Sequence, residues 1–174
     1  LFHVGILMVF VGHLCGLLTP LWLWDALGVT HGAKQIIAMS MGGIFGLMAM
    51  VGLIMLLMRR LKCDRLAANT TWRDKLVLIW LIITLGLGLL TILISMGHTD
   101  GHEMVKLMNW AQHIVTFRGG AASHIVDVSL MFKLHMLMGM GLFVIFPFTR
   151  LVHVWSGFAS VSYVGRAWQL VRRR

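Results

Sequence analysis

The sequence has little charge, little proline and almost no cysteine. Charged residues make up 12% of its 174 positions, whereas 59% are hydrophobic, and the mean hydropathy is +0.86. A soluble domain of this length cannot bury so much apolar surface, but a protein surrounded by lipid has no need to bury it. The composition therefore excludes an ordinary soluble fold and predicts an integral membrane protein.

The two cysteines also exclude several kinds of site. Cys15 lies in an apolar run and Cys63 lies among basic residues, and they form neither a CxxC motif nor a disulfide pattern. They cannot by themselves hold zinc or an iron–sulfur cluster. Acidic residues are scarce as well, so the net charge is +9. Because the basic residues cluster beside apolar runs, this charge favours a signal for membrane orientation over nucleic-acid binding.

Four apolar segments are long enough to cross a bilayer, which takes about 20 residues of helix. We expect them at about residues 1–24, 35–58, 76–96 and 126–154. Backbone groups in lipid must form their hydrogen bonds within each helix. The expected fold is an all-α membrane protein, a single domain over residues 1–174 built as an antiparallel bundle of four transmembrane helices.

The basic residues predict how this bundle is oriented. Eleven lie on one side, in the loop 59–75 and near the C-terminus: Arg59, Arg60, Lys62, Arg65, Arg73, Lys75, Arg150, Arg166, Arg172, Arg173 and Arg174. Four lie on the other side: Lys34, Lys106, Arg118 and Lys133. The positive-inside rule places the loop 59–75 and the tail 155–174 in the cytoplasm and the loop 97–125 outside. Within that outer loop, residues 103–117 are expected to form an amphipathic helix at the membrane surface.

Four of the nine histidines lie within the membrane segments. His3 and His13 belong to the first segment, and His135 and His153 to the last. Polar side chains at this depth need a partner, and haem iron is one, because axial imidazoles bind it while an apolar bundle buries the macrocycle. The other five lie in or beside outer loops, where a solvated imidazole is expected: His31, His98, His102, His113 and His124.

Depth in the membrane pairs these four histidines across two antiparallel helices. His3 and His153 are expected near the cytoplasm, and His13 and His135 near the outer face, which gives two bis-histidine haem sites. At about 1.5 Å per residue, the separations along the two helices are roughly 15 Å and 27 Å, so tilt and a kink at Pro147 must absorb the difference. Hydrogen bonding between the helices is the alternative role. Several glycines are expected to leave room for the macrocycles: Gly5, Gly12, Gly16, Gly139 and Gly141.

The sequence around these histidines resembles a known family. The stretches LFHVGILMVFVGHLCGLLTP, KLHMLMGMGLFVIFPFTRLVHVWS, NWAQHIVTFRGGAASH and YVGRAWQLVRRR closely resemble the gamma subunit of respiratory nitrate reductases, and the likeness covers nearly the whole chain. That family is the di-haem cytochrome b membrane anchor of a three-subunit quinol:nitrate oxidoreductase in the cytoplasmic membrane of prokaryotes. It has five membrane helices, of which the first is absent here, so we expect further residues upstream of Leu1.

The resemblance implies roles for individual residues. It implies that the His13–His135 pair binds an outer haem b and the other pair an inner haem b. It also implies a quinol site at Gly12, His13 and Lys34, where the lysine ammonium is a suitable donor to a quinone oxygen. A snorkelling lysine at the membrane surface is the alternative.

The implied function is electron transfer across the membrane. Quinol from the quinone pool is oxidised near the outer face, and electrons pass through both haems to the cytoplasmic side. There the family has an iron–sulfur beta subunit and a molybdenum-containing alpha subunit, which reduces nitrate. Arg59, Arg60 and Arg150 are candidates for contacts with haem propionates or a partner, and the alternative is that they signal only topology.

Two other functions stay open at this point. One is the di-haem cytochrome b of another quinone-linked reductase, such as a heterodisulfide-reductase-like or sulfur-cycle complex. The other is a transporter whose intramembrane histidines relay protons or bind a metal ion. A b-type absorbance band distinguishes electron transfer from transport.

Overall fold

A computed structural model describes residues 1–97, 99–149, 151 and 153, and every regular element in that part of the chain is helical. The elements are α1 (Phe2–Leu18), α2 (Leu21–Ala26), α3 (His31–Lys62), α4 (Asp64–Ala67), α5 (Trp72–Ser95), α6 (His102–Val115), the 3-10 helix η1 (Ala121–Ile125), α7 (Leu130–Ile145) and the 3-10 helix η2 (Phe146–Phe148). Three stretches are long and apolar enough to cross a membrane, namely α3, α5 and α7 together with η2, and α1 is a shorter apolar helix. The expected all-α membrane bundle is confirmed.

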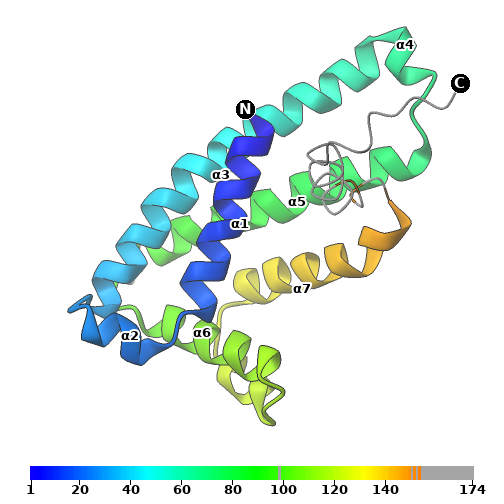
Figure 1. The fold of residues 1–174 in the computed structure, drawn as a ribbon. Helices are drawn as coiled ribbons and strands as arrows, with labels where there is room; N and C mark the ends of the chain where they lie inside the picture. Colours follow the sequence, from blue (N-terminus) through cyan, green and yellow to red (C-terminus); the bar gives the residue numbers. More distant parts are fainter. Residues whose placement is uncertain (98, 150, 152, 154–174) are drawn as a thin grey trace, which may run out of the picture.

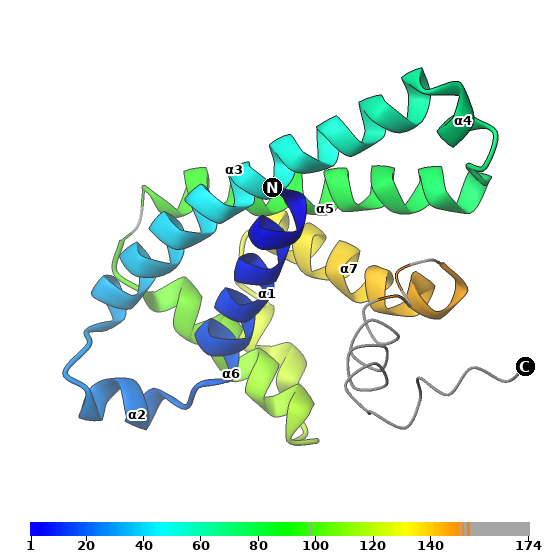
Figure 2. The ribbon, with the colours of Figure 1, turned by 45° about the horizontal axis from the view of Figure 1, so that its top comes forward.

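The four apolar helices run in alternating directions (Figure 1). Helices α3 and α5 form a long hairpin closed by α4, and α7 packs against α5. Helix α1 crosses α3 obliquely, as Figure 2 shows from a second direction. The short α2 and the helix α6 lie at the end of the bundle where α1 stops and α3 begins (Figure 1). This end corresponds to the side that the charge pattern places outside.

The first apolar segment is shorter as a helix than the expected residues 1–24. Helix α1 stops at Leu18, and Thr19 has an extended backbone with ψ of 124°. Pro20 explains the break, because its ring disfavours helical geometry in the residue before it and it has no N–H to donate. Pro20 instead precedes α2, which carries Trp24 away from the axis of α1.

The last expected span, residues 126–154 with a kink at Pro147, contains a shorter α-helix, and its residues 150, 152 and 154 lie outside the described part of the chain. Helix α7 begins at Leu130 and ends at Ile145, where the chain turns into η2, which contains Pro147. His153 lies beyond this turn, so the roughly 27 Å estimated along the helix axis does not apply. Helix α3, in contrast, extends past both ends of the expected 35–58. The Thr30 hydroxyl caps its first turn by accepting a hydrogen bond from the Ala33 N–H at 3.2 Å.

Close backbone contact joins α1 to α3. A Cβ atom at Gly5 would lie 2.6 Å from the backbone nitrogen of Ala49, and one at Gly52 would lie 2.5 Å from that of Phe2. Small residues of this kind let membrane helices approach each other closely. Next to this crossing, Leu53 packs with Val77 and Leu81 in the described core. The crossing therefore fixes where α1, and the histidines it carries, lie relative to α3.

We expect Gly5→Ala to destabilise the protein, because the added methyl group would overlap the α3 backbone. Packing strain of this kind typically costs about 1–3 kcal/mol, which thermal unfolding in detergent can measure. Gly43→Ala is the matched control, since a Cβ there meets no other atom within 4 Å. Equal unfolding temperatures for the two variants would contradict the close contact.

Candidate functional site

Two pairs of histidine rings face each other across the bundle. The ring centroids of His13 and His135 are 6.0 Å apart, with an angle of 41° between the ring planes. Those of His3 and His153 are 6.3 Å apart, with an angle of 81°. The structure thus brings together the same pairs that depth in the membrane predicts from the sequence. Each pair joins α1 to the chain from α7 onward.

The spacing within each pair fits two ligands of one metal ion. Imidazoles on opposite sides of a metal have centroids about 6 Å apart, given metal–nitrogen bonds of about 2 Å and about 1 Å from nitrogen to centroid. A direct N–H···N hydrogen bond between two rings would bring the centroids to roughly 5 Å. Both observed distances, 6.0 and 6.3 Å, agree with the metal-bound arrangement. Each separation is therefore compatible with one metal ion, such as a haem iron, held between the two rings.

Hydrogen bonds to backbone carbonyls orient both rings of the His13–His135 pair. We call it the outer pair, because the charge pattern predicts that it lies toward the outer face of the membrane. Nδ1 of His13 lies 2.8 Å from the carbonyl oxygen of Val9, one turn earlier in α1. Nδ1 of His135 lies 2.9 Å from the carbonyl oxygen of Thr84 in α5. A carbonyl oxygen only accepts, so Nδ1 carries the proton in each ring and Nε2 keeps its lone pair. This is the tautomer that an axial ligand needs, and metal-bound histidines commonly donate their second nitrogen in this way.

Only some of the glycines expected to make room for a macrocycle face open space. A Cβ at Gly12 or Gly139 would meet no other atom within 4 Å. Gly12 precedes His13 in α1, and Gly139 lies one turn after His135 in α7. Gly5 serves the contact with α3 instead. Gly141 accommodates Trp80 of α5, whose indole N–H donates to the Met138 carbonyl at 2.9 Å.

Lys34 lies in the first turn of α3 and is 4% exposed. Its ammonium group lies 4.8 Å from the ring centroid of Trp24 and donates to the Met108 sulfur. These contacts come from α2 and α6, whereas Gly12 and His13 lie on α1. A lysine this deeply buried differs from the snorkelling surface residue that the sequence left as an alternative. Trp24 and Met108 were not expected here, because no sequence pattern connects them to Lys34.

Helix α6 holds the outer ends of α1 and α3 together. The Gln112 amide donates to the carbonyl oxygens of Leu17 and Thr19, at 3.2 and 3.1 Å, where α1 ends. Four residues earlier on α6, Met108 contacts Lys34 of α3. The helix expected over residues 103–117 is thus present, with its inner face on the two helices that carry Lys34 and His13. Its location at the membrane surface stays a prediction.

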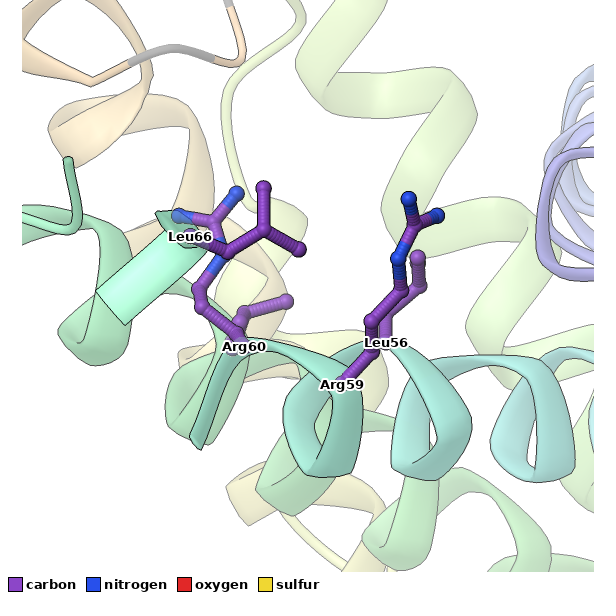
Figure 3. Close-up of a pocket in the computed structure, with 5 residues that line it drawn as sticks. Leu56, Arg59, Arg60 and Leu66 are labelled. Atoms are coloured by element: carbon purple, nitrogen blue, oxygen red, sulfur yellow. The ribbon is translucent and has the colours of Figure 1, made fainter. Parts of the chain in front are cut away.

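Two of the three arginines line a small cavity at the opposite end of α3. Arg59 and Arg60 enclose about 200 Å³ together with Leu56, Leu66 and Leu78 (Figure 3). A guanidinium nitrogen of Arg60 lies 3.5 Å from Asp74, whose side chain is 4% exposed. The cavity is smaller than the roughly 300–1,000 Å³ of typical ligand pockets. Arg150 lies outside the described residues.

Another histidine pair lies between α6 and η1. The rings of His113 and His124 meet edge to face with centroids 4.6 Å apart, and Nδ1 of His113 lies 3.1 Å from the Gly119 carbonyl oxygen. Among the described residues, no group of three or more His, Cys, Asp or Glu side chains is placed to hold a metal ion. His113 and His124 therefore form an edge-to-face ring contact with no third ligand among these residues.

Comparisons with known proteins identify a family that this chain resembles over its whole length. The family model described as nitrate reductase gamma subunit matches residues 1–174. The chain is 49% identical over 174 residues to the respiratory nitrate reductase 1 gamma chain of Escherichia coli, covering all of this chain and 76% of that protein. It is 48% identical to the respiratory nitrate reductase 2 gamma chain of the same organism, with the same coverage. It is 32% identical to the nitrate reductase gamma chain of Bacillus subtilis, covering all of this chain and 77% of that protein.

Proposed function

This chain belongs to the nitrate reductase gamma subunit family, a membrane subunit of a respiratory oxidoreductase, and we propose that it is the subunit that oxidises quinol. The proposal rests on one observation, the two pairs of facing imidazole rings, of which one lies near each end of α1. Two b haems bound there supply one-electron transfer from the outer side to the cytoplasmic side. The proposed partners are an iron–sulfur beta subunit and a molybdenum-containing alpha subunit that reduces nitrate.

The four histidines hold the two haem irons in this proposal. His13 and His135 present Nε2 lone pairs to the outer iron, because the Val9 and Thr84 carbonyls hold their Nδ1 protons. His3 and His153 face each other at the inner position. The absorbance spectrum of the purified complex tests this assignment. A reduced b-type α band from two haems per chain is expected, and its absence would favour a transporter instead.

The quinol site is proposed beside Gly12 and His13, with Lys34 as the hydrogen-bond donor. The ammonium group has three donor hydrogens, and in the structure one goes to the Met108 sulfur. A thioether is a weak acceptor, so exchanging it for a quinol oxygen costs little. A Cβ atom at Gly12 would meet no other atom within 4 Å, so the surface of α1 next to His13 is uncovered at this position.

The expected orientation of the chain in the membrane links this reaction to charge separation. The charge pattern places the Lys34 end of the bundle outside and the Arg59 end in the cytoplasm. Quinol oxidation then releases protons outside, while nitrate reduction consumes electrons and protons inside. Electron transfer between the two ends therefore separates charge across the membrane.

Lys34→Ala is expected to lower quinol-dependent nitrate reduction by about 10- to 100-fold, the worth of a hydrogen bond from a charged donor. A soluble reductant that feeds the catalytic subunit directly should support the wild-type rate. Lys106→Ala is the matched control, because that lysine lies on α6 and pairs with Glu103 at 3.0 Å. Equal quinol-dependent rates for Lys34→Ala and the wild type would remove Lys34 from the site.

A di-haem cytochrome b of another quinone-linked reductase would hold its haems in the same way. The gamma-chain relatives favour nitrate as the final acceptor. Copurification of the partner subunits with a molybdenum analysis separates the two. A complex without molybdenum would point to the other reductase.

A further inference from the structure

The imidazole ring of His135 contacts two residues of α5, Thr84 and Gly88. Helix α5 itself supplies none of the proposed haem ligands. Nδ1 of His135 lies 2.9 Å from the Thr84 carbonyl oxygen. One turn later in α5, a Cβ atom at Gly88 would lie 2.9 Å from Cε1 of the ring, 3.4 Å from Nδ1 and 3.5 Å from Nε2. The imidazole therefore rests directly on the Gly88 backbone while it donates to Thr84.

Helix geometry explains why these two residues act together. Every Cα–Cβ bond in a helix tilts toward the N-terminus, so a side chain covers the turn that precedes its own Cα. A side chain at position 88 would consequently cover the carbonyl of Thr84, four residues earlier. Glycine leaves that carbonyl open to a group from another helix. The contact between His135 and Thr84 thus depends on the absence of a side chain at Gly88.

The two ligands of the outer pair differ in what orients them. The Nδ1 partner of His13 is Val9, which belongs to the same helix, so this ring keeps its orientation wherever α1 moves. The Nδ1 partner of His135 belongs to α5, so this ring is oriented by the packing of α7 on α5. Trp80 reinforces that packing through its bond to the Met138 carbonyl.

We propose that Gly88 is a positioning residue of the outer haem site, because it opens the Thr84 carbonyl that orients His135. The inference rests on the proposed function, since it takes His135 as an axial ligand. A hydrogen bond at Nδ1 makes the imidazole a more basic ligand, and ligand basicity is one of the properties that set the reduction potential of a haem. Gly88 therefore governs both the retention of the outer haem and its potential.

The test is Gly88→Ala in the full-length subunit within its complex, followed by redox titration of both b haems and by EPR. The added methyl group displaces the ring and covers the carbonyl. We expect the outer haem to be bound roughly 10- to 100-fold more weakly, the range found when the outer-sphere partner of a metal ligand is lost. Any outer haem that is retained should have a raised midpoint potential and a shifted EPR signal. The signal of the inner haem should not change, which also reports that the subunit has assembled.

Two control variants separate this role from general packing. Gly86→Ala places a methyl group on the same helix at an ordinary 3.8 Å from Cε of Met50, and it should leave both haems unchanged. Thr84→Ala removes the hydroxyl that donates to the Trp80 carbonyl but keeps the Thr84 carbonyl, so the outer potential should stay at its wild-type value.

The outcomes distinguish this inference from the function on which it rests. If His135→Ala abolishes the outer signal but Gly88→Ala leaves signal and potential unchanged, the inference fails alone. If His135→Ala itself leaves the outer signal intact, the haem assignment fails. Should Gly88→Ala not assemble, electron–nuclear double resonance on the wild-type outer haem decides. An exchangeable, hydrogen-bonded Nδ1 proton on the His135 imidazole is expected, and its absence from that ring overturns the proposal.

Discussion

His135→Ala is expected to abolish the outer haem and quinol-dependent nitrate reduction while the inner haem remains. The methyl side chain has no nitrogen to bind iron, and His13 alone cannot form a six-coordinate b-type site. Loss of an outer-sphere partner already weakens metal binding about 10- to 100-fold, so loss of the ligand itself should exceed that range. The inner pair lies elsewhere along α1 and shares no ligand with the outer one. Optical and EPR spectra of the purified complex measure both haems.

His124→Ala is the matched control for this experiment. His124 also lies on the outer side and also packs against another histidine ring, but that contact is with His113 between η1 and α6. Both b signals and the quinol-dependent rate should survive its loss. If His135→Ala retains two b haems, the pairing of His13 with His135 as ligands is wrong, whatever happens to activity.

His3→Ala should produce a different defect. The inner haem is lost with its ligand, but the outer pair, Lys34 and the quinol site keep all their described contacts. Addition of quinol should still change the b-type spectrum, now through the outer haem alone. Nitrate reduction with quinol should fall by more than about 100-fold, by the same ligand argument, because the route to the cytoplasmic partner is interrupted.

Rapid mixing of each variant with quinol separates the two defects. The spectral change should be absent from His135→Ala and present in His3→Ala, whereas neither variant reduces nitrate with quinol. A soluble reductant that feeds the catalytic subunit directly should support nitrate reduction in both. If His3→Ala loses the quinol-dependent spectral change as well, the order of the two sites along the electron path must be revised.

The membrane bundle and the pairing of the histidines could be predicted from the sequence. Hydropathy identifies α3 and α5 because their apolar runs are long and end in polar or basic residues. Depth pairs His13 with His135 because helices that alternate in direction bring the end of one segment beside the start of another. Both arguments use only rise per residue and topology, which local sequence determines.

The surroundings of the site could not be predicted in this way. Hydropathy assigns Trp24 to the first span, because the apolar run continues past Pro20 and gives no sign of the break. The burial of Lys34 depends on α2 and α6 folding back over the start of α3. The contact of the His135 ring with Thr84 and Gly88 depends on the register between α5 and α7. Each is a contact between segments distant in sequence, and no periodicity encodes it.

The carbonyl bonds of the outer pair have a consequence for the energy yield of the complex. If Nε2 binds iron as proposed, while the Nδ1 proton is donated to a carbonyl oxygen, neither imidazole has a free nitrogen that could accept a further proton. We therefore expect His13 and His135 to take no part in moving protons through the membrane. In the proposed function, this keeps the path of the electrons separate from any path of the protons at the outer pair.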